Sequence, residues 1–229
     1  MDSRPPTIDH PNLPIAARLL RSGQFLDAEI VLRTILRESP DCARAKFLLG
    51  VAVMKQKRYA QARDLLEAST ASRQDFPDAV QVDHFLGWTC YYLGDLDAAK
   101  RAFQAHVHAV PTAADSYFGL GVVAIDEDRI SDAEQALRRS MELLPPPPHG
   151  NRDRAKALAR LGDCALRRDH ADEALALYEE SSQVFADHAE VWGKLAHAYE
   201  QAGRVDDAKA ARVRQDSLAS PPVGQQVSP

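Results

Sequence analysis

The chain has 229 residues, a formal net charge of −5, 45% hydrophobic residues and 27% charged residues. This balance is typical of a folded globular protein and excludes an intrinsically disordered chain, which would be poorer in apolar residues. An acidic chain is also a poor match for duplex nucleic acid, because neutralising the phosphates requires a surplus of Lys and Arg on one face. We therefore expect no nucleic-acid partner.

The N-terminus and the cysteines narrow the class of protein further. The opening residues, MDSRPPTIDH, lack the apolar run of a secretory signal, and no apolar stretch approaches the ~18 residues of a membrane-spanning helix. Cys42, Cys90 and Cys164 have neither the even count of a disulfide framework nor the spacing of a zinc site. We expect a cytoplasmic protein with no inserted membrane segment, no metal and no cofactor. The Ala- and Arg-rich composition points to a bacterial source.

An internal repeat dominates the chain from residue 9 onward. A small residue after a large aliphatic one recurs in steps of 34, 37, 34, 41 and 34, at Ala16, Gly50, Gly87, Gly121, Gly162 and Ala196. A second small residue recurs in the same steps, at Ala28, Ala62, Ala99, Ala133, Ala174 and Ala208. Within the repeats, apolar residues recur at helical spacing, and no segment alternates with period two. The pattern predicts six pairs of helices and no sheet.

The repeated residues resemble the tetratricopeptide pattern, W-x2-L-G-x2-Y, then A-x3-F, then P, over 34 residues. The sixth repeat carries the opening half as Trp192, Leu195, Ala196 and Tyr199, and the third carries the closing half as Ala99, Phe103 and Pro111. Position four departs from the family in the first five repeats, where it holds Asn12, Lys46, Asp83, Tyr117 and Leu158. The resemblance covers residues 9–218 and implies an all-α, right-handed α-solenoid of helix-turn-helix repeats. Gly or Ala at the recurring small positions lets the two helices of a repeat approach closely, because a larger side chain would hold the backbones apart.

The two long steps mark interruptions of the array. The step of 37 implies three extra residues near 72–77, and the step of 41 implies seven around Pro145–Pro148. We interpret the proline tract as a stiff spacer, and a docking site for a Pro-binding module is the alternative. The predicted divisions are a disordered N-terminus (1–8), repeats one to four (9–144), a Pro-rich linker (145–154), repeats five and six with a cap helix (155–218), and a disordered tail (219–229).

Motifs that would indicate catalysis have simpler explanations. The segment 119–124 matches the dinucleotide fingerprint G-x-G-x-x-A, but its glycines fall inside a predicted helix instead of a strand-to-helix turn. His106 and His108 are two apart on a helix, so they point in different directions and cannot chelate a metal together. Cys90 takes a large-apolar position of the repeat, which indicates a buried structural thiol. We predict no catalytic residue and no enzyme.

The resemblance implies that the first helix of each repeat lines a concave face. The positions concerned are apolar in the middle repeats and polar in repeats five and six. The predicted partner-binding residues are Phe47, Val51 and Met54 in repeat two, His84, Trp88, Tyr91 and Tyr92 in repeat three, Phe118, Val122 and Ile125 in repeat four, and Lys156, Arg160 and Arg167 in repeat five. As a set they predict an exposed apolar strip followed by basic side chains, which is typical of a partner site. Packing against neighbouring helices is the alternative for any one of them.

These features favour an adaptor or scaffold that binds a peptide or amphipathic helix with large apolar side chains and an acidic group. The family's carboxylate clamp for chaperone tails is matched only at Lys156 and Arg160, so we do not expect chaperone-tail binding in that form. A structural protein that self-assembles through its repeat ends or groove is the alternative, and an enzyme is a weaker one.

Overall fold

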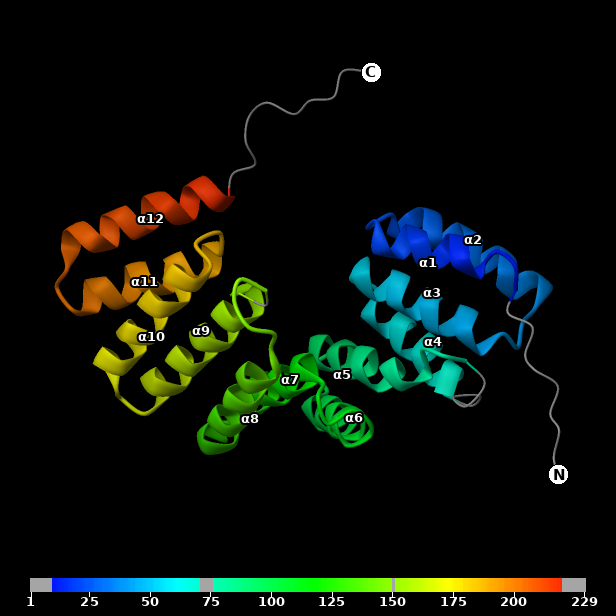
Figure 1. Ribbon diagram of the computed structural model, residues 1–229, viewed down its shortest axis with the longest axis horizontal. Coiled ribbons are helices and arrows are strands. Elements are labelled where there is room, and N and C mark those ends of the chain that lie inside the picture. The colour runs from blue at the N-terminus through cyan, green and yellow to red at the C-terminus, as the bar shows by residue number, and fades with distance from the viewer. Residues whose placement is uncertain (1–9, 71–75, 150, 220–229) are drawn as a thin grey trace, which may run out of the picture. The chain divides into compact units, whose positions relative to one another are not determined.

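The computed structural model describes residues 10–70, 76–149 and 151–219. In these residues the chain forms twelve α-helices, one short 3-10 helix (η2, Ala79–Gln81) and no strand, which confirms the all-α solenoid class (Figure 1). The helices are α1 (Leu13–Arg21), α2 (Phe25–Glu38), α3 (Ala43–Lys55), α4 (Tyr59–Thr70), α5 (Val82–Tyr92), α6 (Leu96–Ala109), α7 (Ala114–Asp126), α8 (Ile130–Leu143), α9 (Asn151–Arg167), α10 (Ala171–Val184), α11 (Ala189–Gln201) and α12 (Val205–Ala219).

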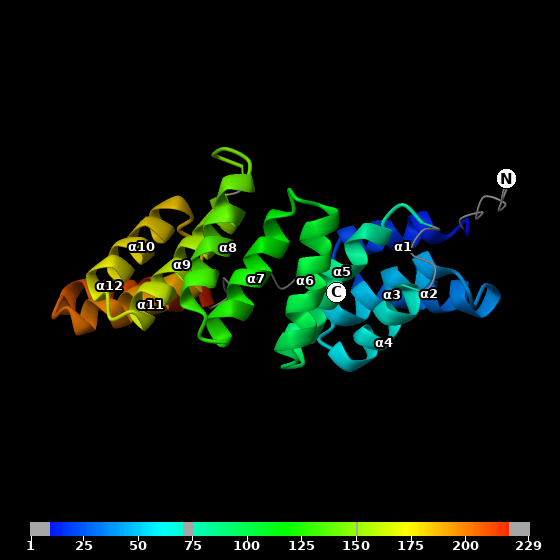
Figure 2. The same ribbon diagram turned by 90° about the horizontal axis from the view of Figure 1, so that it is seen from below.

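The helices follow one another as hairpins, α1 with α2, α3 with α4, and so on to α11 with α12, as Figures 1 and 2 show. The chain divides into two compact units, unit 1 (residues 1–119) and unit 2 (residues 120–229), and the division falls within α7.

Each hairpin turns through one residue in the left-handed backbone region. The six residues are Gly23 (φ 77°), Lys57 (63°), Gly94 (80°), Asp128 (58°), Asp169 (59°) and Gly203 (72°). They recur in the same steps as the two series of small residues. In each turn, the residue that follows the left-handed one donates its backbone N–H to the carbonyl of the residue five positions earlier. Asp95, which follows Gly94, donates in this way to Cys90 (3.0 Å). This arrangement satisfies helix-terminal carbonyls and reverses the chain in the same way six times.

The recurring glycines lie at the contact between the two helices of a hairpin. A Cβ on Gly87 would lie 2.6 Å from the Phe103 ring, and a Cβ on Gly162 would lie 2.5 Å from the Tyr178 ring. At the equivalent positions of two other repeats, a Cβ on Gly50 would meet the side chain of Leu66, and a Cβ on Gly121 would meet that of Leu137. No side chain larger than hydrogen fits there without movement, so the predicted role of these glycines is confirmed.

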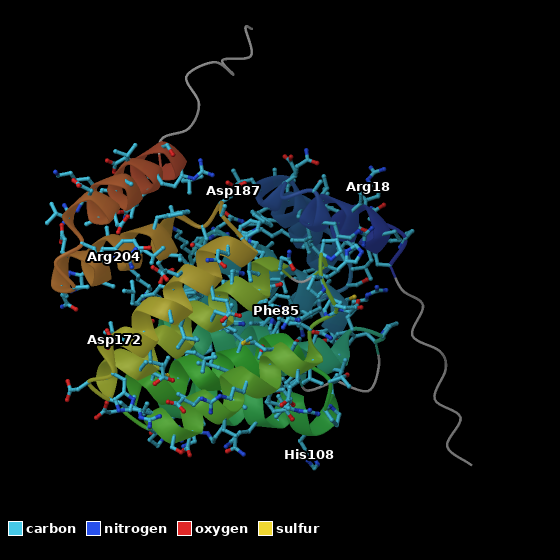
Figure 3. All side chains as sticks on the ribbon, turned by 60° about the vertical axis from the view of Figure 1, so that its left-hand side comes forward. Arg18, Phe85, His108, Asp172, Asp187 and Arg204 are labelled. Atoms are coloured by element: carbon cyan, nitrogen blue, oxygen red, sulfur yellow. The ribbon has the colours of Figure 1, made fainter. Side chains whose placement is uncertain are left out.

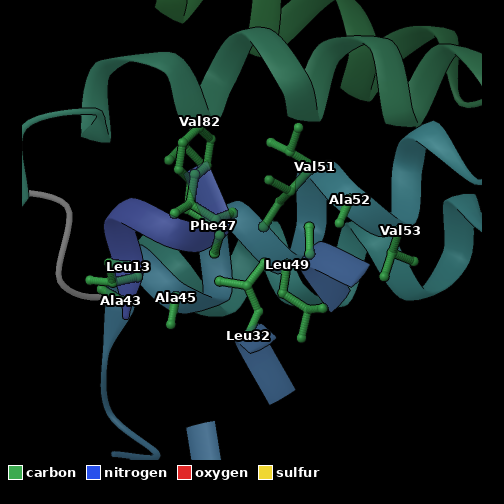
Figure 4. Close-up of a cluster of buried hydrophobic side chains, with 14 of the residues drawn as sticks. Leu13, Leu32, Ala43, Ala45, Phe47, Leu49, Val51, Ala52, Val53 and Val82 are labelled. Carbon is green, nitrogen blue, oxygen red and sulfur yellow. The ribbon is translucent and has the colours of Figure 1, made fainter. Parts of the chain in front are cut away.

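The core of unit 1 runs along α3 and the helices around it. Figure 4 shows Leu13, Leu32, Leu49 and Val82 converging with Phe47 in this cluster. Ten residues of α3 are buried, which explains why that helix lacks a polar face. Glu29 on α2 ties the first two hairpins together, because Gln56 and Arg58 from the next turn both donate to it. Burial opposes ionisation of Glu29, but these bonds and one from Arg33 outweigh it and lower the pKa.

The core of unit 2 centres on Tyr178, Leu195 and small residues of α9 to α11. The predicted linker 145–154 lies inside this unit, and α9 already begins at Asn151. On either side of the proline tract, α8 packs against α9, and Glu134 accepts ion pairs from Arg138 (3.2 Å) and Arg168 (2.8 Å).

The segment boundaries proposed from the sequence stay predictions. The disorder expected for 1–8 and for 220–229, and most of the insertion near 72–77, lie outside the described residues. Ala219, assigned to the tail, ends α12 instead. At the C-terminal hairpin Arg212 is exposed, and it pairs with Glu200 (2.6 Å), as suits a polar cap.

Candidate protein-binding surfaces

Four of the predicted residues of unit 1 meet in an aromatic cluster together with Tyr59, which was not predicted. We define this aromatic cluster as Tyr59, Trp88, Tyr91, Tyr92 and Phe118. Trp88 lies on α5 one turn before Tyr91 and Tyr92, so the three rings share one helix face, with centroids 5.8 Å and 6.1 Å from the Trp88 ring. Phe118 reaches Trp88 from α7 (6.1 Å), and Tyr59 stacks on Tyr92 from α4 (4.8 Å). Three helices of unit 1 therefore contribute to one aromatic surface.

Exposure differs sharply among the residues predicted to form the strip. Tyr92 is 53% exposed, and Trp88, Tyr91 and Phe118 are half-buried. Five others are buried, with no more than 9% exposed: Phe47, Val51, Met54, Val122 and Ile125. The expectation that these five lie on an exposed strip is wrong, since they belong to the packing between helices. Their assignment as partner-binding residues stays a prediction.

The reason is clearest at Phe47, whose ring contacts Phe76 (5.8 Å) and Phe85 (5.7 Å). Phe76 belongs to the segment just before η2, whose packing the repeat pattern does not predict. Phe85, labelled in Figure 3, is half-buried and packs against the core of unit 1. Of the predicted strip in unit 1, the part on α5 is the most open, because it includes the exposed Tyr92.

One helical turn before Trp88, the half-buried His84 forms a polar group with two buried residues, the His84–Ser116–His106 triad. The Nδ1 atoms of His84 on α5 and His106 on α6 each lie 2.8 Å from Oγ of Ser116 on α7. A hydroxyl can donate to one neutral ring and accept from the other, so the geometry suits two uncharged histidines. His108, by contrast, is exposed and points outward (Figure 3), which confirms that it and His106 diverge.

The surroundings favour the neutral histidines. Burial, with the neighbouring His106 and Lys55, lowers the pKa of His84 to about 4. Burial also lowers the pKa of His106, although Asp83 and Asp115 oppose the effect. Nε2 of His106 is buried and has no hydrogen-bond partner in the described part of the chain. A proton added to either ring would therefore enter an unfavourable site.

The corresponding face of unit 2 carries charges in place of rings. Asp163 on α9 accepts from Tyr178 Oη (2.8 Å), Lys194 Nζ (2.6 Å) and Arg160 Nη1 (3.0 Å). Arg160 also pairs with Glu190 (3.2 Å). Asp163, Lys194 and Glu190 border a hollow of about 710 Å³ lined mostly by α9, α11 and α12, with acidic and basic side chains around it. The face is polar, as the repeat positions predict, and its charges largely neutralise one another.

Comparison with models of known protein families identifies the repeat. The family model for the tetratricopeptide repeat matches residues 13–79 and 86–146, and a second model of the same description matches residues 165–211. The chain belongs to the tetratricopeptide repeat family. No curated protein matches it in sequence.

Solved structures with similar tetratricopeptide folds are distant in sequence. One is from the Cut9–Hcn1 hetero-tetramer of the APC/C, with TM-score 0.76 and 16% identity over 90% of this chain and 39% of that chain. Another is pilF of Pseudomonas aeruginosa, with TM-score 0.69 and 17% identity over 90% and 89% of the two chains. A third is YrrB, described as having an unusual peptide-binding site, with TM-score 0.60 and 18% identity over 79% and 88%. The likeness establishes the fold, and this chain spans only 39% of the Cut9–Hcn1 chain it matches.

In this tetratricopeptide array the three predicted basic residues already have partners. Lys156 donates to Asp153 (2.8 Å), and Arg160 is held by Asp163 and Glu190. Arg167 donates to the Ile125 carbonyl (2.8 Å) at the end of α7. A ligand carboxylate would have to compete with these contacts. The role of the three residues in binding an acidic group stays a prediction.

Sequence reasoning overlooked Tyr59 and Lys194. Tyr59 is the first residue of α4, a second helix of its repeat, so a rule restricted to first helices passes over it. Lys194 lies on a first helix, but its importance comes from Asp163, 31 positions earlier in the chain. Neither residue carries a signal that the repeat pattern alone would reveal.

The remaining reactive groups have ordinary structural explanations. Cys90 and Cys164 are free and buried. Burial raises the pKa of the Cys164 thiol to about 11 and raises that of Cys90, so both stay protonated near neutral pH. Among residues 10–70, 76–149 and 151–219, no three His, Cys, Asp or Glu side chains gather as metal ligands would. Within the same residues no helix has the length and apolarity to cross a membrane.

Proposed function

We propose that this chain is a protein-interaction scaffold that binds a segment of another protein on the aromatic cluster of unit 1. The observation that carries the proposal is the gathering of Trp88, Tyr91 and Tyr92 on an accessible face of α5, with Tyr92 more than half exposed. Trp and Tyr supply most of the strong anchor residues in protein interfaces. Their rings offer a large apolar area, and their N–H and O–H groups add polar contacts. Peptide binding by the similar fold of YrrB supports the same class of function.

The ligand that fits this surface is a peptide or amphipathic helix with large apolar side chains. Such side chains would pack on the edges and open faces of the rings, since the faces of Tyr59 and Tyr92 that stack are already covered. Lys156 and Arg160, in unit 2, are proposed separately to bind an acidic group, which would compete there with Asp153, Asp163 and Glu190. We therefore assign most of the binding free energy to the aromatic cluster. The sparse, unpaired cysteines further support a cytoplasmic location, which cell fractionation would test.

The experiment is a titration of the partner recovered from the native host against the parent chain and Tyr92→Ala. Tyr92 is the best position because its exposure makes the folded state tolerant of truncation. We expect Kd to rise about thirty-fold, equivalent to about 2 kcal/mol for an interface anchor. Trp192→Ala is the control, because it removes an aromatic side chain of α11 in unit 2 that does not belong to the aromatic cluster. A folded Tyr92→Ala chain that binds like the parent would refute the proposal. Sedimentation velocity of the chain alone tests self-assembly separately.

A further inference from the structure

Among the described residues of unit 1, the most exposed large apolar side chains lie on α2, which contributes nothing to the aromatic cluster. Leu26 and Ile30 are 68% and 66% exposed, more than Tyr92 at 53%. They are four residues apart, so they stand one turn apart on the same helix face. Single exposed apolar residues are ordinary, but an adjacent pair of this size is a feature of interaction surfaces.

Ile30 borders a hollow of about 570 Å³ that α2, α3 and α4 enclose. Its floor is Leu49 of α3, which is 1% exposed, and its apolar walls are Leu36 of α2 and Leu65 of α4. The hollow shares no residue with the aromatic cluster. It offers room for a large apolar side chain beside the exposed Ile30.

The polar border of this hollow is entirely neutral or basic, consisting of Arg33, Thr34 and Arg37. Glu29 already neutralises Arg33 (2.7 Å). Among the described residues, Arg37 donates to the Thr34 hydroxyl (3.0 Å) and forms no ion pair with a carboxylate. On a chain with a net charge of −5, this hollow combines an apolar floor with a guanidinium that no carboxylate of the described residues pairs with.

We propose that the hollow between α2 and α4 is a second docking surface, which takes an acidic amphipathic segment of a partner protein. A large apolar side chain of the segment enters the hollow beside Ile30, and a carboxylate pairs with Arg37. Ile30 and Arg37 are seven positions apart on the helix, a rise of roughly 10 Å. The segment therefore carries its carboxylate about two helical turns from its apolar anchor. This surface lies apart from the one in the proposed function and does not depend on it.

The test begins with random peptides displayed on phage and selected on the immobilised full chain. Enriched peptides are then synthesised and titrated by fluorescence anisotropy against the parent and its variants. We expect one class of peptides that combines a large apolar residue with Asp or Glu. For this class Ile30→Ser and Arg37→Glu should each raise Kd about tenfold or more.

Two controls separate this surface from others. Val213→Ser removes an apolar side chain that is 70% exposed on α12, and Tyr92→Ala damages only the aromatic cluster. Both should leave Kd for this peptide class within about twofold. A Glu→Lys change in the peptide should restore binding to the Arg37→Glu chain, which a loss of folding could not imitate. Leu26→Ser serves as a second apolar variant if Ile30→Ser melts early.

Two results would overturn the proposal. One is a selection in which every enriched peptide loses affinity for Tyr92→Ala and none is affected by the changes on α2. The other is a parent chain that sediments as a dimer which Ile30→Ser dissociates, because the occupant would then be a second copy. Neither result would by itself refute binding at the aromatic cluster, which the Tyr92→Ala titration decides.

Discussion

Trp88 in unit 1 and Asp163 in unit 2 occupy the same position of their repeats, separated by one step of 34 and one of 41. Each of them contacts a ring from the second helix of its repeat, and the two rings also occupy equivalent positions: Phe103 in unit 1 and Tyr178 in unit 2. Trp88 meets Phe103 edge to face (5.2 Å), whereas Asp163 accepts a hydrogen bond from the Tyr178 hydroxyl (2.8 Å). Both rings also cover a glycine of the first helix, at Gly87 and Gly162.

The comparison separates the scaffold from the face that it presents. The glycine and the ring beneath it are common to both repeats, because the helices must approach to the same distance. The residue that contacts the ring from the first helix, Trp88 or Asp163, is not constrained by the distance between the helices. Its side chain determines whether the face is apolar or charged. In unit 1 the result is an aromatic surface suited to apolar ligands, and in unit 2 it is a network of ions that satisfy one another.

The largest effect should come from the shared scaffold. Gly87→Leu and Gly162→Leu each place a side chain where a Cβ alone would lie 2.6 Å or 2.5 Å from a buried ring. We expect each to lower the free energy of unfolding by about 3 kcal/mol through overpacking. Chemical denaturation measures the change. Equal losses would sharpen the comparison, and a parent-like melt of either variant would show that the glycine contact is not a common requirement.

The second prediction concerns pH and a histidine of unit 1. The folded-state pKa of His84 is about 4, below its ordinary value of 6.5, so the unfolded chain binds the proton more readily. Stability from this group is therefore complete above pH 6.5 and is lost as pH falls towards 4. At pH 5 the loss should be about 2 kcal/mol.

Hydrogen exchange of α5 and α6 between pH 7 and pH 5, corrected for the intrinsic rate, follows this loss locally. His84→Gln should flatten the dependence, and the exposed His108→Gln should not. An unchanged slope in His84→Gln would mean that the His84–Ser116–His106 triad does not couple the fold to pH.

The third prediction concerns the ionic face of unit 2. Asp163→Asn removes the charge that Lys194, Arg160 and the Tyr178 hydroxyl share, and it should destabilise the chain by about 1.5 kcal/mol. Raising the salt concentration should shrink the difference, because screening weakens the parent network as well. Asp172→Asn, on an exposed position of α10, is the control. Thermal melts at low and high salt would contradict the interpretation if the difference did not depend on salt.

The smallest effect concerns the turns, which both units share. Gly94→Ala should destabilise by about 1 kcal/mol, because φ is 80° and a Cβ is unfavourable there. Lys57→Gly should change stability by up to about 1 kcal/mol in the opposite direction, since Lys57 adopts a φ of 63° in the equivalent turn. Urea denaturation resolves both changes. Effects of the same sign would show that the two turns are not equivalent.

Sequence alone determined the repeats, the turns and the contact between the helices of each hairpin. Those features depend on residues within one repeat, and six copies in steps of 34, 37, 34, 41 and 34 make the pattern visible. The polar character of the face in repeats five and six could likewise be predicted, because it follows from residue type at a known position.

Tertiary structure alone decided which of the apolar positions stay open. Phe47 and Val122 stand at predicted groove positions and are buried, whereas Tyr92 is exposed. Tyr59 joined the cluster from the neighbouring hairpin, and Lys194 reached Asp163 across a repeat boundary. The physical reason is that exposure and pairing depend on how residues of adjacent repeats meet in space, and a periodic pattern assigns each residue a position in its own repeat without specifying which side chains cover it.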